Sequence, residues 1–526
     1  MVHAKPALPA GHGEVLTRPP FEDWAALASS NHSAAQSWAF TVAGVPAQQL
    51  RQQARREALE AAAEFSAKLG VSVAAAGSPD DLIIATGHQP ELYHPGVWIK
   101  DFLLQRVARE VSATAIDFVV DSDNFQVLGV SSPCMIPGVK RCQQYLAIGS
   151  QNGWYAGSPV PSDRDVHDFC AAVDQMLSSL PTPAVRRHFA TFCAELQALR
   201  PHATNLAELI TMARRRYEEP AGSDYLELAV TRVARMGAFR TFVVDLALNA
   251  ARFADAYNAE LAEYRMVNKT RSAAQPFPDL AVADGFVELP LWLLGENGRT
   301  SVLASSAIDG TIRLVGVDGT VIADLPADPS AAVEALEASG MLIAPKALAL
   351  TTYVRLFACD LFIHGVGGGR YDRITDGVCR RYYGVEPPKF VVASITMYLP
   401  LGAHIVTDEE VAAARARLNR LSHNPDALLG EVEFDSEGER SRAVALAAEK
   451  TELVSAIARP DADKKAVGIR IREVNVALAA LLEPLREGMD AELAGLEAQL
   501  AASEILTDRT YPFCFWSPLE VADKAR

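Results

Sequence analysis

Residues 83–100 gather side chains that could do acid–base chemistry or hold an anion: Gly87, His88, Gln89, Tyr93, His94 and Lys100. Histidine gains and loses a proton near neutral pH, so it can move a proton during a reaction. A lysine ammonium can neutralise an anionic oxygen. The stretch therefore predicts an anion-binding turn, and the alternative is an ordinary βα loop with a polar surface.

A strand and a helix are expected to position these side chains. Residues 82–85 are an apolar run suited to a buried parallel strand. Pro95 suits the first turn of a helix because its φ angle is fixed near the helical value. A strand that leads through a loop into a helix N-terminus is a common anion-binding arrangement, since N–H groups and the helix dipole point at the loop.

An acidic cluster follows the second predicted strand, residues 115–120. It contains Asp121, Asp123 and Asn124. The carboxyl ends of neighbouring parallel strands lie side by side, so we expect these residues to share a pocket with His88 and Gln89. The alternative is turn chemistry, because Asp, Asn and Ser all favour turns.

A third candidate region follows a predicted strand at residues 360–364. Its residues are His364, Gly365, Val366, Gly367, Gly368, Gly369, Arg370, Tyr371 and Asp372. Glycines let a backbone approach a ligand closely, and the following helix offers its N-terminus. The pattern matches neither a P-loop nor the full dinucleotide motif. We expect it to bind a ligand, with Lys346 contributed by a parallel strand at residues 341–346.

Composition limits the possible functions. The chain has 526 residues and a net charge of −16, which indicates several domains and argues against nucleic acid as a partner. Its seven cysteines form no CxxC pair, so we expect reduced thiols in the cytoplasm and assign no metal ligands. Cys514 could be a nucleophile, although a buried cysteine is the favoured interpretation. No apolar run is long enough to span a membrane.

The fold class predicted from these patterns is α/β, with a parallel-sheet core divided by an insertion. The predicted parts are an N-terminal arm and helix (1–79), the first half of the core (80–160), an inserted helical and antiparallel β subdomain (161–340), the second half of the core (341–406), a C-terminal helical region with heptad spacing (407–505) and an aromatic tail (506–526).

The order of these parts resembles the bacillithiol-biosynthesis cysteine-adding enzyme family over roughly residues 80–526. The family's Thr-Gly-Gln-Gln-Pro loop is similar to residues 86–90, where His88 replaces a glutamine. Its Gly-Pro-Leu-Tyr segment and helix lysine are similar to residues 95–98 and Lys100. Its Glu-Asp-His-Asp turn is similar to residues 121–124, and residues 366–372 stand in place of its Gly-Gly-Pro-Gly-Glu turn.

The resemblance implies a Rossmann-like core, a C-terminal coiled coil that forms a homodimer, and ligation of the carboxylate of cysteine to the amine of a small molecule. It implies activation by a nucleotide, ATP or ADP, with Mg²⁺. In that interpretation Arg370 and the glycine turn hold a phosphate or carboxylate, and His88 or His364 moves a proton. Lys100 or Lys346 neutralises anionic oxygens, and Asp121 and Asp123 bind the amine or Mg²⁺.

Three other functions stay open at this point. One is a different nucleotide-using ligase or transferase on the same fold. A second is a non-catalytic binding protein that keeps the scaffold. The third is a metal-dependent hydrolase, whose ligands would be drawn from His88, His94, Asp121, Asp123 and His364.

Overall fold

The computed structural model describes residues 8–135, 139–272, 274–296, 298–307, 309–402, 406–459 and 462–526. The chain forms two compact units. The larger contains the chain up to Cys134, Cys142–Leu399 and Arg509–Arg526, and the smaller contains Met135–Arg141 and Pro400–Asp508.

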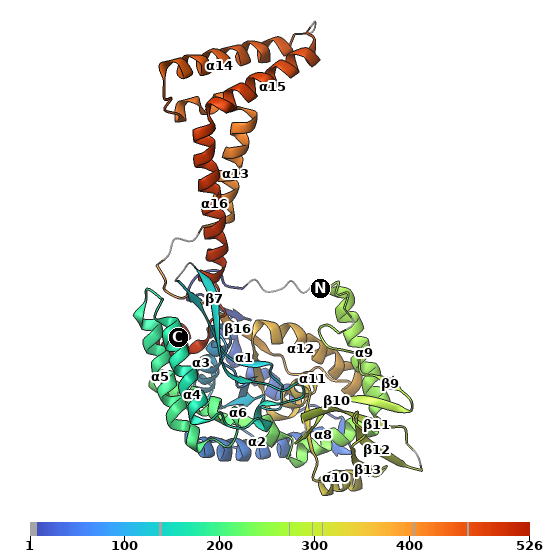
Figure 1. Ribbon diagram of the computed structural model, residues 1–526. Coiled ribbons are helices and arrows are strands. Elements are labelled where there is room, and N and C mark those ends of the chain that lie inside the picture. Colours follow the sequence, from blue (N-terminus) through green and yellow to red (C-terminus); the bar gives the residue numbers. More distant parts are fainter. Residues whose placement is uncertain are drawn as a thin grey trace. The chain divides into compact units, whose positions relative to one another are not determined.

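A six-stranded, largely parallel sheet forms the centre of the larger unit (Figure 1). Its strand order is β1-β16-β15-β4-β5-β8, and only β1 runs antiparallel to its neighbour. The strands are β1 (Val15–Arg18), β4 (Ile83–His88), β5 (Thr114–Val119), β8 (Leu226–Ala229), β15 (Leu361–His364) and β16 (Val391–Ile395). From β4 the chain continues outward to β5 and β8, and it later returns to the other side of β4 through β15 and β16. The connections therefore reverse direction between β4 and β15.

Strand alternation divides the side chains between the two faces of this sheet. Ala85, Ile116 and Phe118 belong to the large apolar core that also contains residues of α2 (Ala47–Leu69) and α8 (Gly237–Leu248). The opposite face carries polar groups toward α3 (Pro95–Glu110) and α6 (Leu206–Glu218). The expected helix from Pro95 is confirmed, and His94 caps it by accepting a hydrogen bond from the N–H of Gly96 at 3.0 Å.

An antiparallel sheet follows the helical segment and has the strand order β13-β12-β11-β10-β14, with β9 paired to β10. Its strands are β9 (Val282–Ala283), β10 (Phe286–Gly295), β11 (Gly298–Ser305), β12 (Thr311–Gly316), β13 (Val321–Pro326) and β14 (Leu342–Pro345). The prediction that residues 341–346 resume the parallel sheet is wrong, because β14 pairs antiparallel with β10. A short apolar run indicates a buried strand without indicating its direction. The sequence Asn297-Gly298 predicts a hairpin-type turn, and Asn297 lies outside the described residues.

Two segments contain strands or helices that were not predicted from their sequences. Residues 161–340 were expected to contain helices and an antiparallel sheet, yet Leu226–Ala229 within them is a parallel strand of the main sheet. The expected N-terminal arm contains β1 and helix α1 (Trp24–Ala35).

The other elements of the larger unit are β2 (Thr41–Val42), β3 (Val45–Pro46), β6 (Val127–Cys134), β7 (Lys140–Ile148), α4 (Asp163–Leu177), α5 (Pro183–Leu199), α7 (Val230–Val233), α9 (Ala250–Val267), α10 (Pro329–Ala338), α11 (Ala347–Tyr353), α12 (Val366–Val378) and α17 (Pro518–Lys524).

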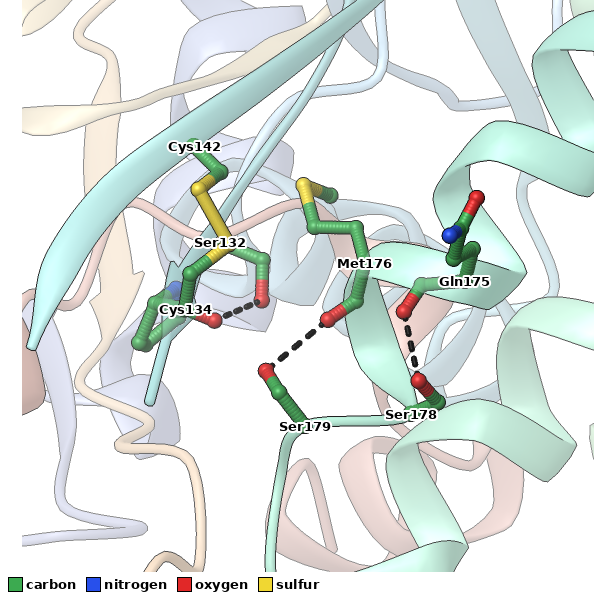
Figure 2. Close-up of a disulfide and its surroundings, with 8 residues drawn as sticks. Ser132, Cys134, Cys142, Gln175, Met176, Ser178 and Ser179 are labelled. Carbon is green, nitrogen blue, oxygen red and sulfur yellow. Dashed lines mark hydrogen bonds between the residues drawn. A yellow bond between two sulfur atoms is a disulfide. The ribbon is translucent and has the colours of Figure 1, made fainter. Parts of the chain in front are cut away.

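A disulfide joins Cys134 and Cys142, which corrects the expectation that all seven thiols are reduced (Figure 2). The two cysteines lie on the paired strands β6 and β7, and their Cα atoms are 6.0 Å apart. A spacing of eight residues does not reveal a hairpin that brings two cysteines together. The other five cysteines are free and buried, Cys514 among them.

The smaller unit contains helices α13 (Asp408–His423), α14 (Glu437–Ile457), α15 (Lys464–Leu481) and α16 (Glu483–Leu506). The expected helical region at residues 407–505 is interrupted at Leu482, where α15 ends, and Pro484 lies in the first turn of α16. The buried apolar residues of these helices include Val474, Leu478 and Met489. In the part of the chain that the structure describes, no helix is long and apolar enough to cross a membrane.

Candidate functional site

A cavity of about 530 Å³ opens at the carboxyl ends of β4 and β15, where the sheet connections reverse direction. Open α/β sheets bind ligands at this position. Residues predicted from the sequence that line the cavity are Gly87, His88, Gln89, Asp123, Lys346, His364, Gly368, Tyr371 and Asp372. Aromatic and aliphatic side chains form much of the remaining wall, among them Phe118, Tyr257, Phe277, Trp292, Leu348 and Phe362.

His364 and Asp372 form a buried pair in the cavity wall. Nε2 of His364 lies 2.8 Å from Oδ2 of Asp372, and Arg355 donates to the same oxygen at 2.6 Å. Burial works to raise the pKa of Asp372, but Arg355 and then His364 outweigh it and hold that pKa well below its usual value. An ionised carboxylate only accepts hydrogen bonds, so Nε2 of His364 carries the hydrogen and Nδ1 can accept a proton. This arrangement is that of an oriented general base.

The glycines beside His364 lie in the first turn of α12 rather than in an open loop. A Cβ atom on Gly368 would lie 2.9 Å from Nδ1 of His364, and one on Gly369 would lie 2.4 Å from Cγ2 of Val392. Glycine at these two positions therefore lets the helix pack against β15 and β16. It also keeps space beside Nδ1 of His364, next to N–H groups that a first helical turn leaves without helical partners.

Arg299 connects the antiparallel sheet to the acidic turn after β5. It donates to Asp123 at 2.7 Å and to Asn124 at 2.7 Å, and Gln89 donates to the other oxygen of Asp123 at 2.9 Å. The guanidinium carbon of Arg299 lies 4.3 Å from the ring centre of Trp292. Asp123, Asn124 and Gln89 thus lie in one cluster, as the sequence predicts. The cation of this cluster, Arg299, was not predicted.

Lys346 has a partner of its own in the cavity wall. Its ammonium lies 2.6 Å from Glu288 and 4.4 Å from the ring centre of Trp292. Burial lowers the pKa of Lys346, and the hydrogen bond to Glu288 opposes that shift. The charge of Lys346 is already compensated by Glu288, so an anionic ligand would have to exchange with that carboxylate.

Several predicted site residues have structural partners elsewhere. Asp121 accepts from the N–H of Thr231 at 2.9 Å and from its hydroxyl at 2.5 Å. Lys100 is buried and donates to Thr86 and to the carbonyl of Gly87, both at 3.1 Å. Arg370 and Gly367 are exposed and do not line the cavity. The ligand set of the expected metal-dependent hydrolase is therefore not assembled, because His94 caps α3 and Asp121 bonds Thr231.

His88 lines the cavity, but its ring does not join His364. Thr86 pairs with Ile363 across the two strands, so His364 shares a face of the sheet with Gly87, and His88 belongs to the other face. There its Nε2 atom lies 3.5 Å from Oδ1 of Asp101 and 3.6 Å from Oδ2 of Asp117. The ring also lies beside Tyr93, with 4.3 Å between the ring centres.

His88 thereby belongs to a buried network of ionisable side chains on the face toward α3 and α6. Arg214 donates to Asp101 at 3.0 Å, to Asp117 at 3.1 Å and to Glu227 at 2.7 Å. Burial raises the pKa of Glu227 well above its usual value, although Arg214 opposes that shift.

The sequence carries a signal for this network that spacing arguments overlook. Asp117 and Glu227 interrupt apolar strands, and fully buried carboxylates occur almost only with partners. Asp101, next to Lys100 in α3, and Arg214, in α6, carry no comparable local signal. No local sequence pattern identifies Arg299 and Glu288 either, because their role depends on where the antiparallel sheet lies.

The site as a whole offers a general base, two half-buried ion pairs and apolar walls. No family model matches the chain, and no curated protein matches it.

Proposed function

We propose that the protein forms an amide bond between the carboxyl group of a small, cysteine-like amino acid and the amine of a small acceptor. The reaction takes place in the cavity at the ends of β4 and β15. The observation that carries this proposal is the His364–Asp372 pair, whose Nδ1 atom adjoins the cavity and the first turn of α12. The motif resemblance supports the same reaction class.

His364 acts as the general base in this reaction. The amine nitrogen attacks the carbonyl carbon of a carboxyl group that is already activated as a mixed anhydride with phosphate, and it loses a proton to Nδ1 of His364. The bond from that carbon to the phosphate oxygen then breaks, and phosphate leaves as an anion. Asp372 holds the ring and stabilises the imidazolium that forms. The N–H groups at the start of α12 face the position where negative charge develops on the carbonyl oxygen.

The paired charges of the cavity suit a ligand that carries both signs. An amino acid has an ammonium and a carboxylate before reaction. The carboxylate can contact Lys346 or Arg299, and the ammonium can contact Glu288 or Asp123, so each buried charge keeps an opposite partner. The apolar wall around Trp292 then receives the side chain.

A nucleotide and Mg²⁺ remain part of the proposal through the motif resemblance alone. The cations that line the cavity, Arg299 and Lys346, are already paired with carboxylates of its wall, Asp123 and Glu288, and the two other lining carboxylates, Asp372 and Asp279, are paired with Arg355 and Arg265. A polyphosphate does not fit that set of charges without a metal ion of its own. We therefore route no step through a nucleotide.

The strand order supports a Rossmann-like core. Read from β8 through β5, β4 and β15 to β16, the parallel strands follow the order 3-2-1-4-5 of a doubly wound sheet. The resemblance to the cysteine-adding family implies the same core with an insertion between its halves.

We further propose that the C-terminal helices form a coiled coil and join two copies of the chain. Helix α15 exposes Ile469 and Val476, at 46% and 71% of their surface. Light scattering should give the mass of a dimer for the protein and of a monomer for Val476→Glu, while Glu473→Gln stays dimeric. A monomeric wild-type protein would refute this part.

An assay for amide products tests the proposed function. The protein is incubated with ATP, Mg²⁺, a panel of amino acids and a panel of small amines, and the products are read by mass spectrometry. We expect a product whose mass equals amino acid plus amine minus water, and its loss in His364→Gln. The control Gly367→Ala changes an exposed neighbour in the same helix turn and should keep activity. Retention of full activity by His364→Gln would refute the assignment.

A further inference from the structure

We propose that His88, Asp101 and Asp117 bind a divalent transition-metal ion on the face of the sheet opposite His364. The three side chains come from β4, α3 and β5, and each can offer one ligand atom such that all three atoms lie within 4.8 Å of one another. The site is separate from the proposed amide-forming chemistry, and its test does not depend on that activity.

The hydrogen bond of Nδ1 determines the tautomer in which His88 faces the carboxylates of Asp101 and Asp117. Nδ1 lies 3.1 Å from the carbonyl oxygen of Gln89, which can only accept, so Nδ1 carries the hydrogen. In the neutral ring Nε2 then presents a lone pair toward Asp101 and Asp117. A metal-binding histidine usually has this arrangement, with its other N–H donated to a carbonyl or carboxylate.

Three buried atoms around this point have no hydrogen-bond partner among the residues that the structure describes: Nε2 of His88, Oδ1 of Asp101 and Oδ1 of Asp117. His88 is 8% exposed, and both aspartates are fully buried. Each aspartate gives its Oδ2 atom to Arg214, at 3.0 and 3.1 Å, and keeps the other oxygen. Buried polar atoms without partners are costly, so a positive ligand between them is the natural partner.

The spacing fits a bound ion better than a hydrogen bond. Nε2 of His88 lies 3.5 Å from Oδ1 of Asp101, which has no hydrogen-bond partner among the described residues, and 3.6 Å from Oδ2 of Asp117, which also accepts from Arg214. Both distances are longer than a normal N–H···O contact. Ligands at bond lengths of 2.0–2.2 Å around a tetrahedral ion lie about 3.3–3.6 Å apart.

The donor set indicates the class of ion. An imidazole favours Zn²⁺, Fe²⁺ and similar ions, and carboxylates accept these as well as Mn²⁺. Mg²⁺ and Ca²⁺ prefer oxygen ligands throughout. Arg214 takes the position of an outer partner that holds both carboxylates in place.

Metal analysis of the purified full-length chain tests this site. The protein is stripped with EDTA, loaded in turn with Zn²⁺, Mn²⁺, Fe²⁺ or Co²⁺, separated from free ion and measured by mass spectrometry. We expect about one ion per chain for at least one metal, and less than about a tenth of that in His88→Gln and Asp101→Asn. The matched control His32→Gln also removes a histidine beside a buried carboxylate, at 3.0 Å from Asp360, and should keep the ion.

A second measurement on the unaltered chain keeps the test decisive if a variant does not fold. The Co²⁺-loaded protein should show visible d–d absorption without sulfur-to-cobalt charge transfer, because the proposed ligands contain no cysteine. Less than about a tenth of an ion per chain for every metal, an equal content in His88→Gln, or a sulfur charge-transfer band would each overturn the proposal.

Discussion

Gly368 lies directly against the histidine that we assign as the base. A Cβ atom on Gly368 would lie 2.9 Å from Nδ1 of His364. The glycine thus leaves free the one nitrogen of that ring that the contact with Asp372 does not use.

Replacing Gly368 with alanine should block Nδ1 of His364 without unfolding the protein. We expect the rate of amide formation to fall by about 10²-fold or more, the usual contribution of a general base. Alanine favours a helix over glycine by about 1 kcal/mol, so thermal stability should stay close to that of the wild type. Gly367→Ala is the matched control, since nothing lies within 4 Å of its added Cβ. Equal rates for the two variants would contradict the role of Nδ1.

Replacing Asp372 with asparagine should lower both the reaction rate and the stability of the protein, and comparison with Asp376→Asn separates the two effects. The variant loses the carboxylate that holds His364, so we expect about a 10²-fold lower rate together with a loss of about 2 to 3 kcal/mol in unfolding free energy. Asp376→Asn breaks another contact of Arg355, at 2.7 Å, and spares His364. It should lose similar stability and much less activity. Calorimetry and initial rates check both, and equal rate losses would count against the pair.

Replacing Arg299 with glutamine should weaken substrate binding more than chemistry. The change leaves Asp123 without its cation and removes one of the two cations beside Trp292. We expect KM for the amino acid to rise about 10-fold while kcat changes less than 3-fold, because this contact is the same in ground and transition states. In a double-mutant cycle with Asp123→Asn, the two changes should be non-additive by about 1 kcal/mol. Additive effects would show that the pair does not act together.

Asp121 should make stability fall as pH rises between about 4 and 6. Burial raises the pKa of this carboxyl from 3.8 to about 6, although the hydrogen bonds from Thr231 oppose the shift. The folded state therefore binds the proton more tightly than the unfolded state, and its stability declines as the proton is lost. A shift of that size corresponds to about 3 kcal/mol. Denaturant unfolding at several pH values should show a steeper decline for wild type than for Asp121→Asn, and parallel curves would refute the assignment.

Much of the fold could be predicted because local sequence patterns indicate its strands and helices. The apolar runs at residues 82–85 and 115–120 predicted β4 and β5, and Pro95 marked the start of α3. His364 and Asp372 were both selected because they flank one strand-to-helix turn. These are local features, and a single sequence carries them.

The errors came from relationships that depend on register and on distant segments. His88 and His364 both line the cavity, yet strand alternation places their rings on opposite faces of the sheet, which was not predicted. A shift of one residue in strand register would reverse that result, and the sequence does not specify register across separate segments. Arg299 reaches Asp123 from 176 residues away along the chain, so no local pattern could identify it.

Chemical rescue of a His364 variant tests the central claim most directly. His364→Ala should form amide at least about 10²-fold more slowly than wild type at saturating substrate, and added imidazole should restore part of the rate by taking the amine proton. The same imidazole should not accelerate the wild type. A His364→Ala enzyme that keeps more than about half of the wild-type rate, or gains nothing from imidazole after losing activity, would contradict the account.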